Sequence, residues 1–432
     1  MKYRFALRIS QPLIVMLLLC LFVSWTFIFL CFSSEKLQEN SSKTYTLPQA
    51  KPEEVGLSSE RLQELTTFIE KSVEEKKIPG AVVLVARDGK IAYFEGFGIR
   101  DGATKAPMKT DSIFRIYSMT KPIVSVAVLM LLDGGKISLD DPISKYIPEL
   151  GGLKVGVEDP MEEFKMVPSK RDMTILDLLR HTSGLTYGVF FTSKVKSLYK
   201  EARIHDKNQT VEEMVAKLAK LPLAYEPGTT WEYSRSTDVL GHLIQVVSGM
   251  PLDRFLEERI FKPLKMVDTG FWVKSEKQDR IAQPGNPKLL NVTTPPKFLS
   301  GGGGLESTAG DYARFAQMLL NCGELDGVQI LKTETVALMT KDHLGPLGNR
   351  NDQEYFPGPF SGFGLGVAVF NKPILFREPG SFWWIGWAGT VFGVNPNKKL
   401  IRILMFQNPG LTEDNIYMWL HFGTYGEKSV SD

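Results

Sequence analysis

Hydrophobic residues repeat at helical spacing near the start of the globular part of the chain, and strand-like runs follow them directly. Leu62, Leu65 and Ile69 lie three or four positions apart, which predicts an amphipathic helix. The next stretch, AVVLVARDGKIAYFEGFG, contains two β-rich runs around a central DG dipeptide, which is typical of a tight hairpin. We therefore expect a helix followed by two antiparallel strands.

The middle of the chain has a helical pattern, and strand patterns return near its end. Residues 120–132 are apolar nearly all round, which is typical of a buried helix. Further helices are predicted at 174–180, 211–221, 237–247, 252–260 and 413–421, and strands at 363–370, 389–396 and 400–406. This order predicts a mixed α/β (α+β) fold, in which an antiparallel sheet flanked by helices is built from both chain ends around an inserted all-helical region.

An uncharged apolar segment precedes these elements. Residues 9–34 contain no charge and follow Lys2, Arg4 and Arg8. The apolar part is long enough to span a bilayer and ends without a small-residue cleavage motif. We predict that residues 1–34 form a signal anchor, with a cleaved signal peptide as the alternative, and that residues 35–52 form a linker. Because flanking positive charges stay in the cytoplasm, the remainder is expected outside it, in a periplasmic, extracellular or lumenal location.

Composition and charge exclude several classes of function. The 432 residues include 51 Lys and Arg against 49 Asp and Glu, so no electrostatic attraction to nucleic acid is expected. Of the three cysteines only Cys322 lies outside the leader, so a disulfide framework is excluded. Neither a metal-ligand cluster nor a nucleotide fingerprint is present, and we expect no cofactor and no metal.

The strongest candidate chemistry lies at the start of the predicted buried helix. In FRIYSMTK, Ser118 precedes Lys121 by three positions, so the two side chains share one helix face. Burial can deprotonate a lysine, which can then activate a serine. The same S-x-x-K spacing recurs at 33–36 and 193–196, where no buried helix begins, so the context favours Ser118.

Several longer stretches resemble one family. FRIYSMTKPI, MTILDLLRHTSGL, PGTTWEYSRSTDVLGHLIQVVSG and GGGGLESTAGDYARFAQMLLNCGELDG are similar to successive blocks of the serine β-lactamase superfamily. Within it they resemble the class C-like branch and its family VIII carboxylesterases. The resemblance covers about residues 53–422. It implies a β-lactamase/transpeptidase-like domain at 53–425, with a helical subdomain at about 119–295 and a sheet subdomain at about 53–118 and 296–425.

The resemblance also implies roles for particular residues. Ser118 matches the acylated nucleophile and Lys121 the group that activates it. Tyr233 matches the tyrosine that relays a proton between the nucleophile and the leaving group. The β-lactamases have tyrosine-x-asparagine at this second motif, whereas this chain has Arg235 in place of the asparagine. Arg235 is therefore either a substrate contact or a structural ion pair.

The third motif departs from the β-lactamases. Their lysine-threonine-glycine triplet is absent, and Trp384, Ile385 and Gly386 occupy the matching position, as in esterase members. By resemblance these three residues bind substrate, and the backbone N–H groups of Ser118 and Trp387 form the oxyanion hole. A competing histidine-x-glycine pattern at 421–423 falls in a predicted helix and is rejected.

These observations predict a serine hydrolase that forms an acyl-enzyme. We expect a carboxylesterase for short or medium acyl esters, whose partner is a small-molecule ester or amide substrate. The alternatives are a β-lactamase, a D-alanyl-D-alanine carboxypeptidase, or an inactive penicillin-binding-like protein. His181 is expected to be a hydrogen-bonded turn residue, and the glycines at 301–304 are expected to form a tight connection near the site.

Overall fold

The computed structural model describes residues 46–158, 163–190, 192–286, 288–345, 349–350, 355 and 357–431. The predicted membrane segment and most of the predicted linker lie outside these residues. Within the described part of the chain, no helix has both the length and the apolar composition needed to cross a membrane.

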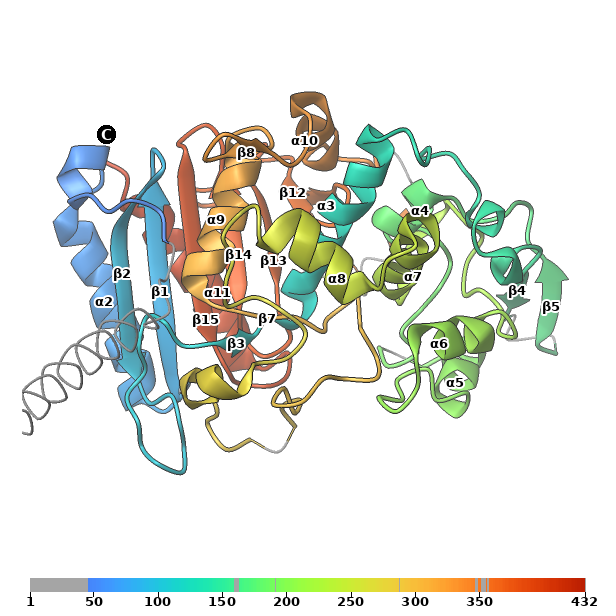
Figure 1. The fold of residues 1–432 in the computed structure, drawn as a ribbon, viewed down its shortest axis with the longest axis horizontal. Helices are drawn as coiled ribbons and strands as arrows, with labels where there is room; N and C mark the ends of the chain where they lie inside the picture. Colours follow the sequence, from blue (N-terminus) through green and yellow to red (C-terminus); the bar gives the residue numbers. More distant parts are fainter. Residues whose placement is uncertain are drawn as a thin grey trace, which may run out of the picture. The chain divides into compact units, whose positions relative to one another are not determined.

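A seven-stranded antiparallel sheet forms the framework. Its strands run in the order β11 (Ser361–Phe363), β12 (Ala368–Phe370), β13 (Phe382–Ile385), β14 (Val391–Asn395), β15 (Leu400–Phe406), β1 (Gly80–Arg87) and β2 (Lys90–Gly98). The predicted hairpin is therefore present as β1 and β2. Ala81 lies opposite Phe406, and Figure 1 shows the early strands beside the late ones. The predicted sheet built from both chain ends is confirmed.

Helices cover both faces of this sheet. On one face α2 (Ser59–Glu74) and α11 (Glu413–Lys428) pack together, over Val83 and Val85 of β1. On the other face α9 (Ala309–Leu320) packs on β1 and β15. Alternate residues of β1 enter the two cores, as the period-two geometry of a strand requires.

The inserted region is helical and centres on α7. This helix (Ser236–Ser248) packs against α3 (Thr120–Asp133) and against three shorter helices. The shorter helices of the region are α4 (Ile175–Leu179), α5 (Lys194–Glu201), α6 (Val211–Leu218) and α8 (Leu252–Leu256). A small exposed hairpin, β4 (Lys154–Val157) and β5 (Lys165–Pro168), also lies here. Figure 1 shows these helices grouped at the end of the molecule away from β2.

Two late elements differ from the sequence prediction. Residues 363–370 form parts of two strands rather than one, because the chain turns at 364–367 between β11 and β12. Gly366 has φ +87 there, and a Cβ would lie 2.0 Å from the Ser125 hydroxyl, so the turn requires glycine. The hydrophobic pattern also does not indicate α9, whose polar Asp311, Arg314 and Gln317 are buried with its apolar residues.

Candidate active site

Ser118 lies at a kink between a short strand and a buried helix. β3 (Phe114–Arg115) pairs with β7 (Glu306–Ser307), and the chain then enters the 3-10 turn Tyr117–Met119, which leads directly into α3. Tyr117 has φ +42, a conformation that costs a residue with a Cβ roughly 1–2 kcal/mol. This strained residue begins the 3-10 turn, and the next residue, Ser118, lines a large cavity.

Lys121 is fully buried beside this serine. Its Nζ lies 3.3 Å from Ser118 Oγ, 3.0 Å from the Tyr187 hydroxyl and 2.6 Å from the Gly302 carbonyl oxygen. Since a neutral amine still has two N–H groups and one lone pair, Lys121 can donate to the carbonyl and to Tyr187 while it accepts from Ser118. The predicted pairing of hydroxyl and amine is therefore present in the structure.

Burial changes the protonation of this amine. It lowers the pKa of Lys121 from its ordinary value of 10.5 to about 7, because a cation loses its hydration in an apolar surrounding. The Asp238 carboxylate opposes this shift, and the Arg235 guanidinium adds to it. A substantial fraction of Lys121 is consequently neutral near pH 7.

Tyr233 completes a group of three side chains. Lys121 Nζ lies 4.5 Å from the centre of its ring. Burial raises the pKa of Tyr233, and hydrogen bonds with the Ser118 hydroxyl and the Trp384 indole partly oppose that effect. The phenol is therefore protonated at neutral pH and lies within hydrogen-bonding reach of the serine. The structure thus brings Ser118, Lys121 and Tyr233 together.

A buried carboxylate supports the lysine indirectly. Asp238, near the start of α7, accepts hydrogen bonds from Ser300 Oγ at 2.6 Å and from Gly302 N at 3.0 Å. It also forms a 3.0 Å ion pair with Arg235. Because Asp238 holds the N–H of Gly302 while Lys121 bonds its carbonyl, the predicted tight glycine connection positions a direct partner of the amine.

The end of β13 packs closely against the segment before Ser118. The chain turns after Gly386, whose N–H donates to Thr390 O at 2.7 Å. A Cβ on Gly386 would lie 2.1 Å from Thr390 Oγ1 and 2.4 Å from Ile116 O, so only glycine fits. The turn brings the Trp387 ring to 5.4 Å from that of Tyr117, beside the residue that precedes Ser118.

The predicted substrate residues occupy different places. Ile385, Trp387 and Arg235 line the cavity. Trp384 is completely buried, with its ring 5.7 Å from that of Tyr233, and Gly386 serves the close turn. The lining at the third motif is thus supplied by Ile385 and Trp387, whereas Trp384 supports the phenol from behind.

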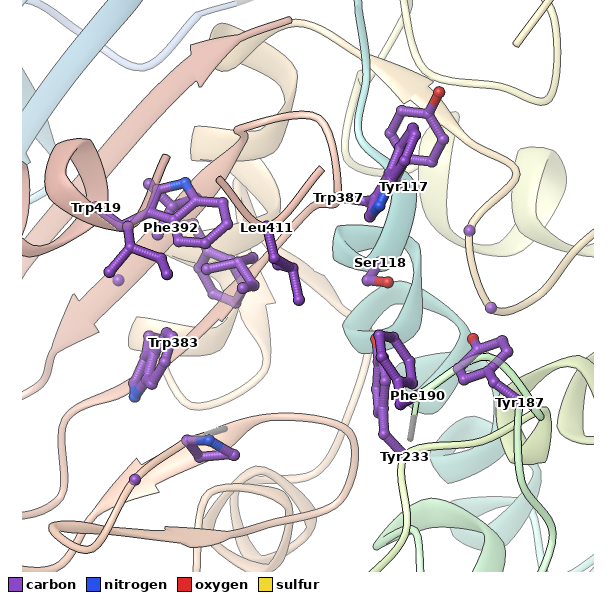
Figure 2. A pocket seen from close by; sticks show the side chains of 18 of the residues that line it. Tyr117, Ser118, Tyr187, Phe190, Tyr233, Trp383, Trp387, Phe392, Leu411 and Trp419 are labelled. Carbon is purple, nitrogen blue, oxygen red and sulfur yellow. The ribbon is translucent and has the colours of Figure 1, made fainter. Parts of the chain in front are cut away.

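The cavity has a volume of about 1040 Å³ and extends to both sides of Ser118 (Figure 2). We call one side the tyrosine arm; its lining includes Tyr187, Phe190, His205, Tyr233 and Arg235. We call the other side the α11 arm; its lining includes Trp383, Ile385, Val391, Leu411, Ile416, Trp419 and Leu420. This size is at the upper end of small-molecule sites.

Sequence reasoning did not identify two residues of this site. Tyr187 contacts the lysine amine, and its position six residues after His181 carries no chemical pattern of its own. Asp238 is a buried acid in the first turn of α7, and a charged residue inside an otherwise apolar helix face was an available signal.

The other residues considered from the sequence lie in a turn or a helix. His181 has φ +57, its Nδ1 lies 3.3 Å from Ser234 Oγ, and burial lowers its pKa well below the ordinary value. The rejected pattern at 421–423 lies within α11. In the described part of the chain, no group of three or more His, Cys, Asp and Glu residues has an arrangement that could hold a metal ion.

Known proteins resemble this chain in sequence and in fold. The family model described as Beta-lactamase matches residues 65–421. An uncharacterized protein of Mycobacterium tuberculosis is 36% identical over 365 residues, covering 78% of this chain and 88% of that protein. Esterase EstB of Burkholderia gladioli is 30% identical over 357 residues, covering 76% and 84%. The solved structure of EstCE1, a hydrolase with promiscuous acyltransferase activity, has a TM-score of 0.70 at 24% identity, covering 86% and 98%.

The chain therefore belongs to the beta-lactamase family. The predicted family, the β-lactamase/transpeptidase-like fold and the class of enzyme, a serine hydrolase related to esterases, are confirmed.

Proposed function

We propose that the protein is a carboxylesterase that forms an acyl-enzyme on Ser118 and transfers the acyl group to water. The observation that carries this proposal is the buried Lys121 amine, 3.3 Å from Ser118 Oγ, with a pKa lowered to about 7. Such an amine is a suitable general base near neutral pH. An inactive penicillin-binding-like scaffold would have no need for an expensively buried amine at this place.

In the acylation step, neutral Lys121 takes the proton of the Ser118 hydroxyl as Oγ attacks the ester carbonyl carbon. The carbonyl electrons move onto oxygen, where the N–H groups of Ser118 and Trp387 stabilise the oxyanion. The intermediate then expels the alcohol, which receives a proton from Tyr233, and Lys121 returns its proton to the phenol. Deacylation repeats these steps with water as the nucleophile and Ser118 Oγ as the leaving group.

The composition of the site favours neutral esters. Where β-lactamases have a lysine in the third motif, this chain has Trp384, Ile385 and Gly386, and the lining there is Ile385 and Trp387. A carboxylate buried without a cation costs several kcal/mol, so β-lactams and D-alanyl peptides are disfavoured. Arg235 and Lys207 are cations of the tyrosine arm, and the Arg235 guanidinium is already paired with Asp238 at 3.0 Å.

A fluorophosphonate probe distinguishes an active serine hydrolase from an inactive penicillin-binding-like protein. We expect it to label Ser118 in the full-length protein, with the labelled peptide identified by mass, and to leave the Ser118→Ala variant unlabelled. A wild-type protein without label on Ser118 would contradict the proposal.

Substrate preference separates the esterase from the β-lactamase alternative. We expect efficient hydrolysis of nitrophenyl butyrate and at least a thousandfold lower efficiency on a chromogenic cephalosporin, the scale of an unpaired buried carboxylate. Comparable efficiencies would contradict this and implicate Arg235, in which case Arg235→Ala should abolish the cephalosporin reaction first.

We also propose that residues 1–34 remain attached as a signal anchor and that the hydrolase lies outside the cytoplasm. The uncharged segment behind Lys2, Arg4 and Arg8 supports this. Carbonate extraction should leave the protein in the membrane fraction, and amino-terminal sequencing should find no product that begins near residue 33. Release of such a soluble product would instead favour the signal peptide.

A further inference from the structure

We propose that the α11 arm binds the unbranched hydrocarbon chain of the acyl group, so that a dodecanoyl ester is a better substrate than a butyryl ester. This inference rests on the proposed esterase function and extends its substrate class to long-chain, lipid-like esters. It follows from the lining of the arm, the partners of its polar atoms, and its position relative to Ser118 and Tyr233.

The arm lies between the sheet and the last helix. Trp383, Ile385 and Val391 belong to β13 and β14 and face the same core as α11. From the opposite side, α11 and the segment before it supply Leu411, Ile416, Trp419 and Leu420 to the lining. Figure 2 shows Trp383, Leu411 and Trp419 around one open space.

Three of the apolar residues that line the arm are exposed to solvent. Leu411 is 49% exposed, Ile416 45% and Leu420 50%, and the last two lie one helical turn apart on α11. Contiguous exposed apolar groups beside a cavity mark a place that a ligand covers. Their continuity with the cavity that contains Ser118 indicates that this ligand is part of the substrate.

Three polar side chains of the arm have partners, whereas the buried Nε1 of Trp383 has none among the described residues. Arg402 pairs with Glu427 at 2.9 Å, Arg377 Nη2 donates to Leu420 O at 3.1 Å, and Trp419 Nε1 donates to Gly389 O at 3.0 Å. A peptide in this arm would leave its own N–H and C=O groups without partners, which is costly. A hydrocarbon chain has no polar groups that need hydrogen-bond partners, so the apolar lining of the arm fits an acyl chain.

The position of the phenol indicates which half of the ester enters the arm. Tyr233 gives its proton to the departing alcohol, so the alcohol must lie on the side of Tyr233 and Tyr187. Figure 2 shows these tyrosines on one side of Ser118 and Trp383 and Trp419 on the other. The acyl chain, bound to the same carbonyl carbon, therefore extends into the α11 arm.

A series of nitrophenyl esters from butyrate to dodecanoate tests the assignment in the full-length protein. Each CH₂ that enters the arm should raise kcat/KM by up to about fourfold. Leu420→Glu places a carboxylate in the arm and should lower the dodecanoate-to-butyrate ratio of kcat/KM at least tenfold. Val246→Glu, which changes an exposed residue of α7 that is 46% accessible, should leave the ratio unchanged. A flat series, or an unchanged ratio in Leu420→Glu, would overturn the proposal.

Binding without turnover separates failure of the inference from failure of the esterase proposal. In the Ser118→Ala protein, bromododecanoate below its micelle concentration should quench the fluorescence of Trp383 and Trp419, and Leu420→Glu should weaken this binding at least tenfold. If Leu420→Glu fails to melt cooperatively, Ile416→Glu replaces it. Quenching in Ser118→Ala together with a wild type that hydrolyses no ester would overturn the esterase, whereas absence of quenching in Ser118→Ala would overturn the chain site.

Discussion

The burial of Lys121, the proposed general base, has a cost in stability. The unfolded chain holds this amine at a pKa near 10.5, whereas the folded protein lowers that value to about 7. Between these values the unfolded state binds more protons, so folding becomes less favourable as the pH falls from 10.5 toward 7. The buried amine therefore lowers the free energy of unfolding at neutral pH.

Lys121→Met should reveal that cost. We expect the variant to be more stable than the wild type at pH 7 by on the order of 2 kcal/mol, because the pKa shift outweighs the lost contact with Gly302. The difference should shrink as the pH rises toward 10.5. Urea unfolding at pH 7 and pH 10 measures it, and a wild type that is the more stable protein at pH 7 would contradict the burial argument.

If Lys121 is the general base as proposed, the same pKa should set the pH dependence of the reaction. A general base acts in its deprotonated form, so kcat/KM for nitrophenyl butyrate should rise with pH through a midpoint near 7 and then level off. Kinetics from pH 5 to 9 test this. A midpoint near 5 would point to a carboxyl or imidazole group instead of Lys121.

Ser118, Lys121 and Tyr233 should behave as one unit. Ser118→Ala should abolish turnover, while Lys121→Ala and Tyr233→Phe should each lower kcat at least about a hundredfold. Because they handle the same proton, the Lys121→Ala plus Tyr233→Phe double variant should lose far less than the product of the single losses. Strictly multiplicative losses in steady-state kinetics would show that the two groups act independently.

At the scale of elements, the turn after β13 decides how closely the third motif approaches Ser118, the proposed nucleophile. Gly386→Ala would place a methyl group 2.4 Å from Ile116 O, which is backbone and cannot move aside alone. We expect the end of β13 to shift away from Ser118, with a fall in kcat of at least about tenfold because the oxyanion donors are displaced.

Gly270→Ala is the matched control for the Gly386→Ala substitution. A Cβ at Gly270 meets its nearest neighbour, Trp272 O, at 3.7 Å, an ordinary contact. Its kcat should remain within twofold of the wild type. An equal effect of both substitutions would mean that the close approach of β13 does not matter for catalysis.

The sequence predicted elements well where the pattern was local. The buried α3, the first hairpin and the S-x-x-K pair all depend on neighbouring residues. Tyr187 and Asp238 instead lie near Lys121 only because the chain folds back on itself, and the local hydrophobic pattern does not indicate this proximity. The turn at Gly366 was missed because its glycines stand inside an apolar run that otherwise fits a single strand.

At the scale of the whole molecule, one apolar core joins the sheet to the helical region. Val82 and Leu84 of β1 belong to the same buried cluster as Leu240 and Ile244 of α7. We therefore expect residues 46–431 to unfold in one cooperative transition, although the sequence suggests two subdomains.

Leu240→Ala tests this cooperativity. Removing a fully buried leucine should cost about 2–5 kcal/mol, and circular dichroism and tryptophan fluorescence should report the same lowered midpoint. Val246→Ala, at an exposed position of the same helix, should shift neither. Separate midpoints for the two probes would show that sheet and helical region melt independently.

The pairing of the two chain ends also determines when the protein can fold during its synthesis. Ala81 has its partner in Phe406, about 320 residues later, which a ribosome adds in on the order of half a minute at about 5–20 residues per second. During that time β1 and β2 form a hairpin in which the β1 edge that later receives β15 is also unpaired and both apolar faces are uncovered, a state prone to aggregation. Nascent chains should therefore depend on a holding chaperone until the last strand and α11 emerge.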